Sequence, residues 1–338
     1  MHSVVHAPSI ILIVIVIAAL VFDYINGFHD SANAIATVVS TRVMTPRVAL
    51  FMAAVLNFMG ALWSTGVAKT ISKGLVETHV ATQGVILAAV LGAIVWNLIT
   101  WRYGIPSSSS HALIGGLVGA AMVHGGFSVV KWNGILDKVV LPLVGSPLIG
   151  FCLGISIMFA LIAICGPLAP GRVSSAFRKL QPFSAAWMAW NHGLNDAQKS
   201  MGIITLALVS FGVLPNAEGG ATPPTWVILS CATAMALGTS AGGWRIMRTM
   251  GQRIIRLEPI NGFAAELSAG IVIFLASHFQ MPVSTTHVIS GSIFGVGASK
   301  RLSAVRWGVA QTMVVAWVLT LPAAGIVGGL FSLLFAGF

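Results

Sequence analysis

The stretch Asp23–Thr41, DYINGFHDSANAIATVVST, follows the apolar run Ile10–Phe22 and places polar side chains where a membrane helix should be apolar. Inserting an ionised carboxylate into such a helix costs about 2.5–3.5 kcal/mol, so these side chains need partners or a function. On a helix, Asp30, Asn33 and Thr37 share one face. The pattern predicts an ion or substrate site that lines a cavity within the membrane. The alternative is a water-exposed loop between two short helices.

The composition is that of a polytopic membrane protein. Of 338 residues, 57% are hydrophobic and 8% are charged, whereas a soluble domain has about 25% charged residues. We expect an all-α fold with about 10–12 membrane segments, because apolar runs of span length recur and no alternating strand pattern is present. The net charge of +10 comes from short basic clusters between apolar runs. This placement indicates a lipid bilayer as partner and no nucleic acid.

Two motifs recur in the same order, which predicts an internal duplication. GFHDS at 27–31 matches GLNDA at 193–197, and PSSSSH at 106–111 matches PVSTTH at 282–287. The chain therefore divides into a first transmembrane repeat (1–168), a cytoplasmic connecting segment (169–183) and a second repeat (184–338). Residues 9–40 are too long for one straight span of about 20 residues, so we expect a broken helix near Gly27.

The basic residues predict how the repeats are oriented. Five crossings in each repeat would invert the second copy relative to the first. Thirteen of the 18 basic residues then fall on one side, which the positive-inside rule makes cytoplasmic. This arrangement predicts a multi-pass membrane protein with inverted repeats, broken or re-entrant helices and both termini outside. The 13 residues lie at 42–47, 102, 172–179, 245–256 and 300–306.

The serine-rich motifs predict an anion site. A proline at a helix start, followed by small hydroxyl residues, leaves backbone N–H groups and hydroxyls directed at one point. Two such half-helix starts, at 106–111 and 282–287 and here called the first and second cradle, could together surround one tetrahedral oxyanion. An ordinary helix cap with close helix packing is the alternative. His111 and His287, one turn further on, either donate to the anion or cap the helix locally. The predicted phosphate-binding hydroxyls are those of Ser108, Ser109, Ser110, Ser284, Thr285 and Thr286.

The two aspartate motifs predict cation or proton coupling. Asp30 and Asp196 are equivalent in the repeat and should face each other near the midplane, where they could bind a proton, a cation or a metal. Lys199 stands where the first repeat has Asn33, and either pairs with Asp196 or holds the anion. The remaining candidates are Asn33 and Asn195 for the substrate, and His29, Asn26 and Glu266 for coupling. Glu266 could instead be a plain first-turn residue of its helix.

At these residues the sequence resembles the inorganic phosphate transporter (PiT) family, whose signature is close to G-A-N-D-x-A-N-A followed by P-x-S-T-T-H in each half. Here the motifs read GFHDSANA (27–34), GLNDAQKS (193–200), IPSSSSH (105–111) and MPVSTTH (281–287). The variants are most similar to the bacterial low-affinity Pit branch, which implies the bacterial inner membrane as the location. That branch implies proton coupling and phosphate carried with a divalent metal such as Mg²⁺. A homodimer is implied by the resemblance alone.

The resemblance is not complete. His29 replaces the usual asparagine, and Gln198-Lys199 replaces Ala-Asn. The lost asparagine argues against a full sodium shell and favours protons over Na⁺. The resemblance implies a secondary active transporter that imports phosphate by alternating access, with no resident cofactor and no enzymatic activity.

Two other functions are compatible with the residues. A transporter of another oxyanion, such as sulfate, would need the same cradles. An intramembrane hydrolase would use Ser110 or Thr286 as nucleophile and His111 or His287 as base. Adjacent residues on a helix point about 100° apart, and no acid follows either histidine. Both features argue against a hydrolase.

Overall fold

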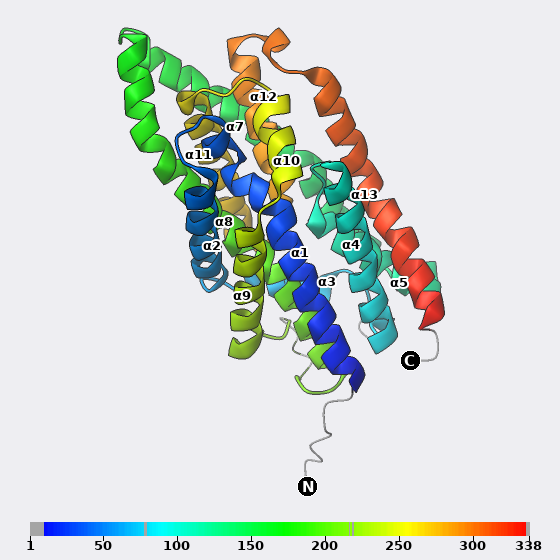
Figure 1. The fold of residues 1–338 in the computed structure, drawn as a ribbon. Helices are drawn as coiled ribbons and strands as arrows, with labels where there is room; N and C mark the ends of the chain where they lie inside the picture. Colours follow the sequence, from blue (N-terminus) through cyan, green and yellow to red (C-terminus); the bar gives the residue numbers. More distant parts are fainter. Residues whose placement is uncertain (1–9, 78–79, 216, 218–219, 336–338) are drawn as a thin grey trace.

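The computed structural model describes residues 10–77, 80–215, 217 and 220–335, which form a helical bundle (Figure 1). The one pair of residues in β-bridge geometry in this part of the chain is Val76 and Val130. The α-helices are α1 (Ile10–Ser40), α2 (Pro46–Ala61), α3 (Gly66–Gly74), α4 (Gln83–Tyr103), α5 (Ser109–Gly125), α6 (Trp132–Ile135), α7 (Leu141–Cys165), α8 (Pro170–Ser210), α9 (Thr225–Ala241), α10 (Trp244–Arg248), α11 (Pro259–His278), α12 (Thr285–Lys300) and α13 (Trp307–Leu334). The short helical turns are η2 (Phe127–Val129), η3 (Leu136–Val140), η4 (Thr249–Arg253) and η5 (Leu302–Ala304).

The helices of the two halves interleave. The long helices α1 and α8 carry the two aspartate motifs and run in opposite directions, and α1 begins at the same end of the molecule at which α13 finishes (Figure 1). α9 packs on α1 and α2 packs on α8; likewise α13 packs on α5 and α7 packs on α12. Each half therefore supplies helices that cover the motifs of the other. In the predicted connecting segment 169–183, residues 170–183 are helical and continuous with the rest of α8, and Ala169 is the N-cap.

The expected break at Gly27 is wrong. α1 is continuous from Ile10 to Ser40, and Gly27 lies at its crossing with α9. A Cβ atom at Gly27 would stand 2.4 Å from the carbonyl oxygen of Met235, closer than side-chain atoms approach a backbone. The equivalent Gly193 of α8 meets α2 in the same way, where a Cβ atom would stand 2.2 Å from the carbonyl oxygen of Asn57. The matched glycines allow close helix packing instead of bending the helices.

The broken and re-entrant segments lie elsewhere. The chain bends by 69° between α2 and the helical residues Gly66–Ser72. It bends by 60° between α9 and the helical residues Trp244–Arg253. Short extended segments that contain Pro106 and Pro282 also connect α4 to α5 and α11 to α12, and the two helices of each pair pack on each other. These prolines stand two residues before the N-caps Ser108 and Ser284, so the prediction that they occupy the first helical position is wrong.

Within the described residues, five helices are long and apolar enough to cross a membrane, or up to seven if each bent pair is one span. α5 and α12, with 17 and 16 residues, are shorter than the about 20 residues of a full span. Figure 1 shows that these two half-helices run from the middle of the bundle towards opposite ends.

The basic loops predicted to share one side do meet at one end of the bundle. Since these loops come from both halves, their proximity agrees with the predicted inversion of the second half. The contacts are hydrogen bonds from the Arg178 guanidinium to the Arg42 carbonyl (3.4 Å), from the Arg245 guanidinium to the Arg102 carbonyl, and from the Arg306 backbone N–H to the Ile254 carbonyl (3.0 Å).

Candidate functional site

The two serine-rich motifs meet in the middle of the bundle. The imidazole rings of His111 and His287, each in the first turn of its half-helix, have centroids 5.0 Å apart. The N-termini of α5 and α12 are therefore adjacent although the motifs are 176 positions apart. Helix N-termini carry unpaired N–H groups and a partial positive charge. The arrangement concentrates anion-binding capacity from both halves at one place.

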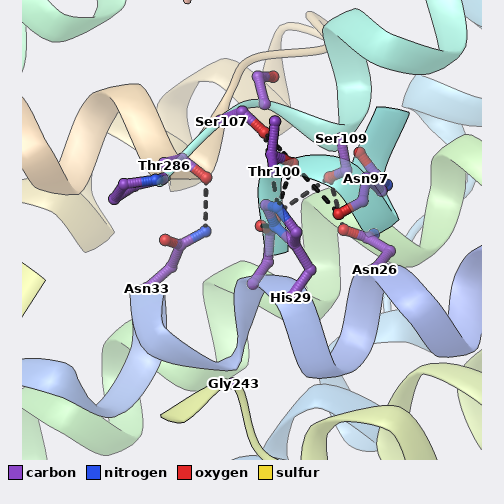
Figure 2. A network of polar contacts seen from close by, with 12 residues as sticks. Asn26, His29, Asn33, Asn97, Thr100, Ser107, Ser109, Gly243 and Thr286 are labelled. Atoms are coloured by element: carbon purple, nitrogen blue, oxygen red, sulfur yellow. Dashed lines mark hydrogen bonds and ion pairs between the residues drawn. The ribbon is translucent and has the colours of Figure 1, made fainter. Parts of the chain in front are cut away.

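Asp30 is the centre of the first-half network, and Figure 2 shows its neighbours His29, Ser109 and Thr100. Its Oδ1 lies 2.6 Å from His29 Nδ1, and its Oδ2 accepts a hydrogen bond from the Ser109 hydroxyl at 2.8 Å. The Ser109 hydroxyl is also within hydrogen-bonding distance of the Asn26 amide oxygen. The other ring nitrogen of His29 lies 3.0 Å from the Thr100 hydroxyl on α4. Coupling candidates on α1 thus touch the first turn of α5 directly.

Asp196 is the centre of the second-half network. Lys199 donates to its Oδ1, and the Thr285 hydroxyl donates to its Oδ2 at 3.0 Å. Lys199 also donates to the Val283 carbonyl oxygen at 3.2 Å. His192, one turn before Asp196 on α8, places Nε2 3.3 Å from the same Oδ2. The alternative of a buried Asp196–Lys199 ion pair is therefore present in this structure.

The two networks are joined across the halves. The Asn33 amide of α1 donates to the hydroxyls of Thr285 (3.1 Å) and Thr286 (2.9 Å) on α12, and Figure 2 shows the second of these bonds. Ligand atoms of Asp30, His192 and Asp196 all lie within 4.8 Å of one another. The expectation that the two aspartates face each other is met, and their surroundings could hold a cation.

The remaining predicted hydroxyls differ in their structural roles. Ser108 and Ser284 act as N-caps, accepting hydrogen bonds from the backbone N–H of His111 (3.2 Å) and His287 (3.3 Å). The capping alternative thus holds for these two side chains, while Ser109 and Thr285 contact the aspartates. Ser110 is buried in the first turn of α5, with 4% of its surface exposed.

Two predicted residues lie away from this centre. The Asn195 amide donates to the Ser277 hydroxyl at 2.9 Å. Glu266 on α11 is fully buried and forms a separate cluster. It accepts hydrogen bonds from the Thr37 hydroxyl, the Ser184 hydroxyl and the Gln181 amide (3.1 Å). Glu266 is therefore connected to both aspartate helices, to α1 through Thr37 and to α8 through Gln181 and Ser184.

The structure adds residues that sequence reasoning missed. His192 was recoverable from its position four residues before Asp196 on one helical face. Thr100 on α4 and Trp317 on α13 had no local signal. The Trp317 ring stacks on His287 with centroids 4.1 Å apart, and its indole N–H donates to the Pro106 carbonyl at 3.0 Å. Trp317 therefore touches both serine-rich motifs.

Comparison with known proteins identifies relatives of this chain. The model of the phosphate transporter family matches residues 26–328. A probable low-affinity inorganic phosphate transporter of Bacillus subtilis is 50% identical over 323 residues, covering 95% of this chain and 96% of its own length. A protein of Rhizobium meliloti with the same description is 49% identical and covers 95% of each chain.

A solved structure described as the sodium-dependent phosphate transporter is 25% identical and superposes with a TM-score of 0.87, covering 96% of this chain and 98% of that one. The match to the family model spans both aspartate motifs and both serine-rich motifs. The chain therefore belongs to the phosphate transporter family.

Proposed function

We propose that this protein imports inorganic phosphate by cation symport at the site between Asp30 and Asp196. One observation carries the proposal. A hydroxyl in the first turn of each half-helix, Ser109 in α5 and Thr285 in α12, is bonded to one of these carboxylates. Backbone N–H groups at helix N-termini are good ligands for phosphate oxygens. The same place can therefore hold the anion and the cations that neutralise it.

The charges at the site support symport. Asp30, Asp196 and Lys199 together carry a net charge of −1 when ionised, and all three are at least 98% buried. A phosphate anion would add further negative charge in a region of low dielectric. Moving each negative charge into a cell at −100 mV costs about 2.3 kcal/mol. A neutral metal–phosphate pair together with one proton would enter with a net positive charge, so that the membrane potential would drive uptake.

We favour the proton as the driving ion over sodium. Lys199 stands where the first repeat has Asn33, and its ammonium contacts Asp196. A fixed ammonium provides no lone pair for a sodium ion, so the second half lacks one neutral oxygen ligand that the first half offers. Sodium remains the alternative, because the similar solved structure is sodium-dependent.

A divalent metal fits the site as cargo that arrives with phosphate. Asp30, Asp196 and His192 bring carboxylate oxygens and an imidazole nitrogen within 4.8 Å of one another. Carboxylates suit Mg²⁺ and Mn²⁺, and an added imidazole suits transition metals. The phosphate oxygens would complete the metal's coordination.

Alternating access is the mechanism that the burial of the site supports. The candidate side chains around Asp30 and Asp196 are almost completely buried, so substrate reaches them only after helices move. A cavity of about 150 Å³ lies at the end of α11 away from the basic loops, and its lining includes Leu194 and Ser277. Ser277 accepts the hydrogen bond from Asn195, next to Asp196. We place the basic end in the cytoplasm by the positive-inside rule, and this cavity on the outer face of the bacterial inner membrane.

The test is phosphate uptake into proteoliposomes with pH, sodium and Mg²⁺ gradients imposed separately. Accumulation driven by an inward proton gradient, without sodium and increased by Mg²⁺, is the expected result. Accumulation that requires a sodium gradient would identify Na⁺, instead of the proton, as the driving ion. Competition experiments address the substrate: arsenate, a tetrahedral oxyanion that matches phosphate in charge, should compete. Equal competition by sulfate would make the protein a general oxyanion transporter.

The hydrolase considered from the sequence has no support. The family consists of transporters, not enzymes. The Thr286 hydroxyl accepts a hydrogen bond from Asn33, and the His287 ring stacks on Trp317 and lies 5.0 Å from the His111 ring, centroid to centroid.

A further inference from the structure

Asp23 is a buried carboxylate that the site described above does not use. It lies on α1 one turn before Asn26 and two turns before Asp30, so the three share a helical stripe. Its side chain is completely buried. Neither carboxylate oxygen has a hydrogen-bond partner among the described residues, and no described cation forms an ion pair with it.

The groups that face Asp23 come from two other helices. The Ser200 hydroxyl of α8 and the Cys231 thiol of α9 lie against the carboxylate without completing a hydrogen bond. Asp196 and Lys199 of α8 interact electrostatically with Asp23. The negative Asp196 repels an ionised Asp23 carboxylate, and the positive Lys199 attracts it. The Lys199 ammonium donates its hydrogen bonds to Asp196 and to the Val283 carbonyl. α4, which also packs on α1, has its one charged side chain, Arg102, in its last turn.

An ionised carboxylate in this position would be unfavourable by several kcal/mol, because it is removed from water and has neither a hydrogen bond nor an ion pair among the described residues. The group is therefore neutral in this conformation, or a cation neutralises it. A sodium ion would need several oxygen ligands, whereas Asp23 is faced by one hydroxyl and one thiol, and thiol sulfur is a soft ligand. A proton needs no further ligand, since it forms one O–H bond.

We propose that Asp23 carries the co-transported proton at a site separate from the two aspartates that contact the substrate cradles. The inference rests on the proposed proton-coupled uptake of phosphate. The carboxylate takes up a proton from water on the outer side and forms an O–H bond. That bond breaks when the carboxyl group meets water on the inner side, and no other group is oxidised or reduced.

The stripe on α1 provides a route for coupling. Asn26, one turn from Asp23, places its amide oxygen against the Ser109 hydroxyl, which also contacts Asp30. Ser200 follows Lys199 directly on α8. A change in the charge of Asp23 therefore acts on the first cradle through the Asn26–Ser109 contact. It acts on the second cradle through the electrostatic interaction between Asp23 and Lys199. The empty site can reorient only with Asp23 neutral, because the ionised form would leave a bare charge in the bundle.

The experiment compares Asp23→Asn with the wild-type protein in proteoliposomes. Asparagine has the shape of a protonated aspartate and cannot ionise, so this variant is expected to fold. It should retain exchange of labelled for unlabelled phosphate at equal pH on both sides. It should lose accumulation driven by a pH gradient and the pH dependence of uptake. Asp23→Glu should retain gradient-driven accumulation, and Asp137→Asn, at an exposed aspartate, should behave as wild type.

A second readout does not depend on transport. Infrared spectroscopy of the purified protein should show a C=O band of a protonated carboxyl group that disappears in Asp23→Asn. Accumulation by Asp23→Asn equal to that of the wild type would overturn the proposal, as would loss of phosphate exchange in the folded variant. A wild-type protein that ignores proton gradients would refute proton-coupled uptake itself and this assignment with it. Loss of sodium dependence instead of pH dependence in the variant would make Asp23 a sodium ligand.

Discussion

A carboxylate oxygen of Asp30 lies within 4.8 Å of a carboxylate oxygen of Asp196, although the residues are 166 positions apart in the chain. Each carboxylate accepts a hydrogen bond from the first turn of a half-helix. Two like charges this close, at a buried place, favour binding of a cation or a proton between them. Equivalent positions in the two repeats thus become one site through antiparallel packing of α1 and α8.

Replacing Asp30 by asparagine removes the charge that Ser109 and His29 contact while preserving the side-chain shape. Hydrogen bonds to charged groups contribute about 1.5–3 kcal/mol, so we expect phosphate uptake to fall by about tenfold to a hundredfold. The purified variant should remain monodisperse on size exclusion, since Asn can keep the bond from Ser109. Asp137→Asn is the matched control at an exposed aspartate. Normal uptake by Asp30→Asn would exclude the Asp30–Asp196 pair from the mechanism.

Replacing Lys199 by glutamine leaves the buried Asp196 carboxylate without its ammonium partner. Breaking a buried ion pair from one side costs about 3–5 kcal/mol, so the thermal unfolding temperature in detergent should drop markedly. The double variant Asp196→Asn/Lys199→Gln should recover most of the stability and none of the uptake. A single variant as stable as the wild type would show that the ion pair is not structural.

Replacing Trp317 by phenylalanine keeps a ring on His287 and removes the indole N–H that binds the Pro106 carbonyl. A hydrogen bond of this kind contributes about 1 kcal/mol, so we expect the KM for phosphate to rise about fivefold. Trp96→Phe is the matched control, because Trp96 donates its indole N–H to Thr320 on the same α13. Equal effects of the two substitutions would indicate general loss of packing around α13 instead of a role in positioning the cradle.

Adding a methyl group at Gly27 forces α1 away from α9, because the new Cβ would stand 2.4 Å from a backbone oxygen. Overpacking of this kind costs about 1–3 kcal/mol. Gly27→Ala should therefore lower the thermal unfolding temperature, and Gly193→Ala should do the same at the crossing of α8 with α2. Gly145→Ala is the control, since a Cβ atom there meets nothing within 4 Å. Unchanged stability of Gly27→Ala would mean that the crossing readily widens.

The candidate site was largely predictable because its residues occur twice. Asp30, Asp196 and the hydroxyls after Pro106 and Pro282 sit in matched motifs, and polar groups in apolar segments are conspicuous. Thr100 could not be found in this way, because a single threonine in an apolar helix is ordinary. Its role arises only where α4 passes the His29 side chain.

By itself the amino-acid sequence determined that this is a helical membrane protein and predicted two repeats with a paired site, because hydrophobicity and motif spacing are local properties of the chain. Tertiary structure alone decided which helices cross. A glycine permits either a bend or a close contact, and the presence of α9 at Gly27 selects the contact. It also decided which carboxylates acquire partners. Asp30 and Asp196 accept hydrogen bonds from hydroxyls of the half-helices, whereas Asp23, on the same helix as Asp30, accepts none from the described part of the chain, because hydrogen-bond partners in a bundle come from neighbouring helices.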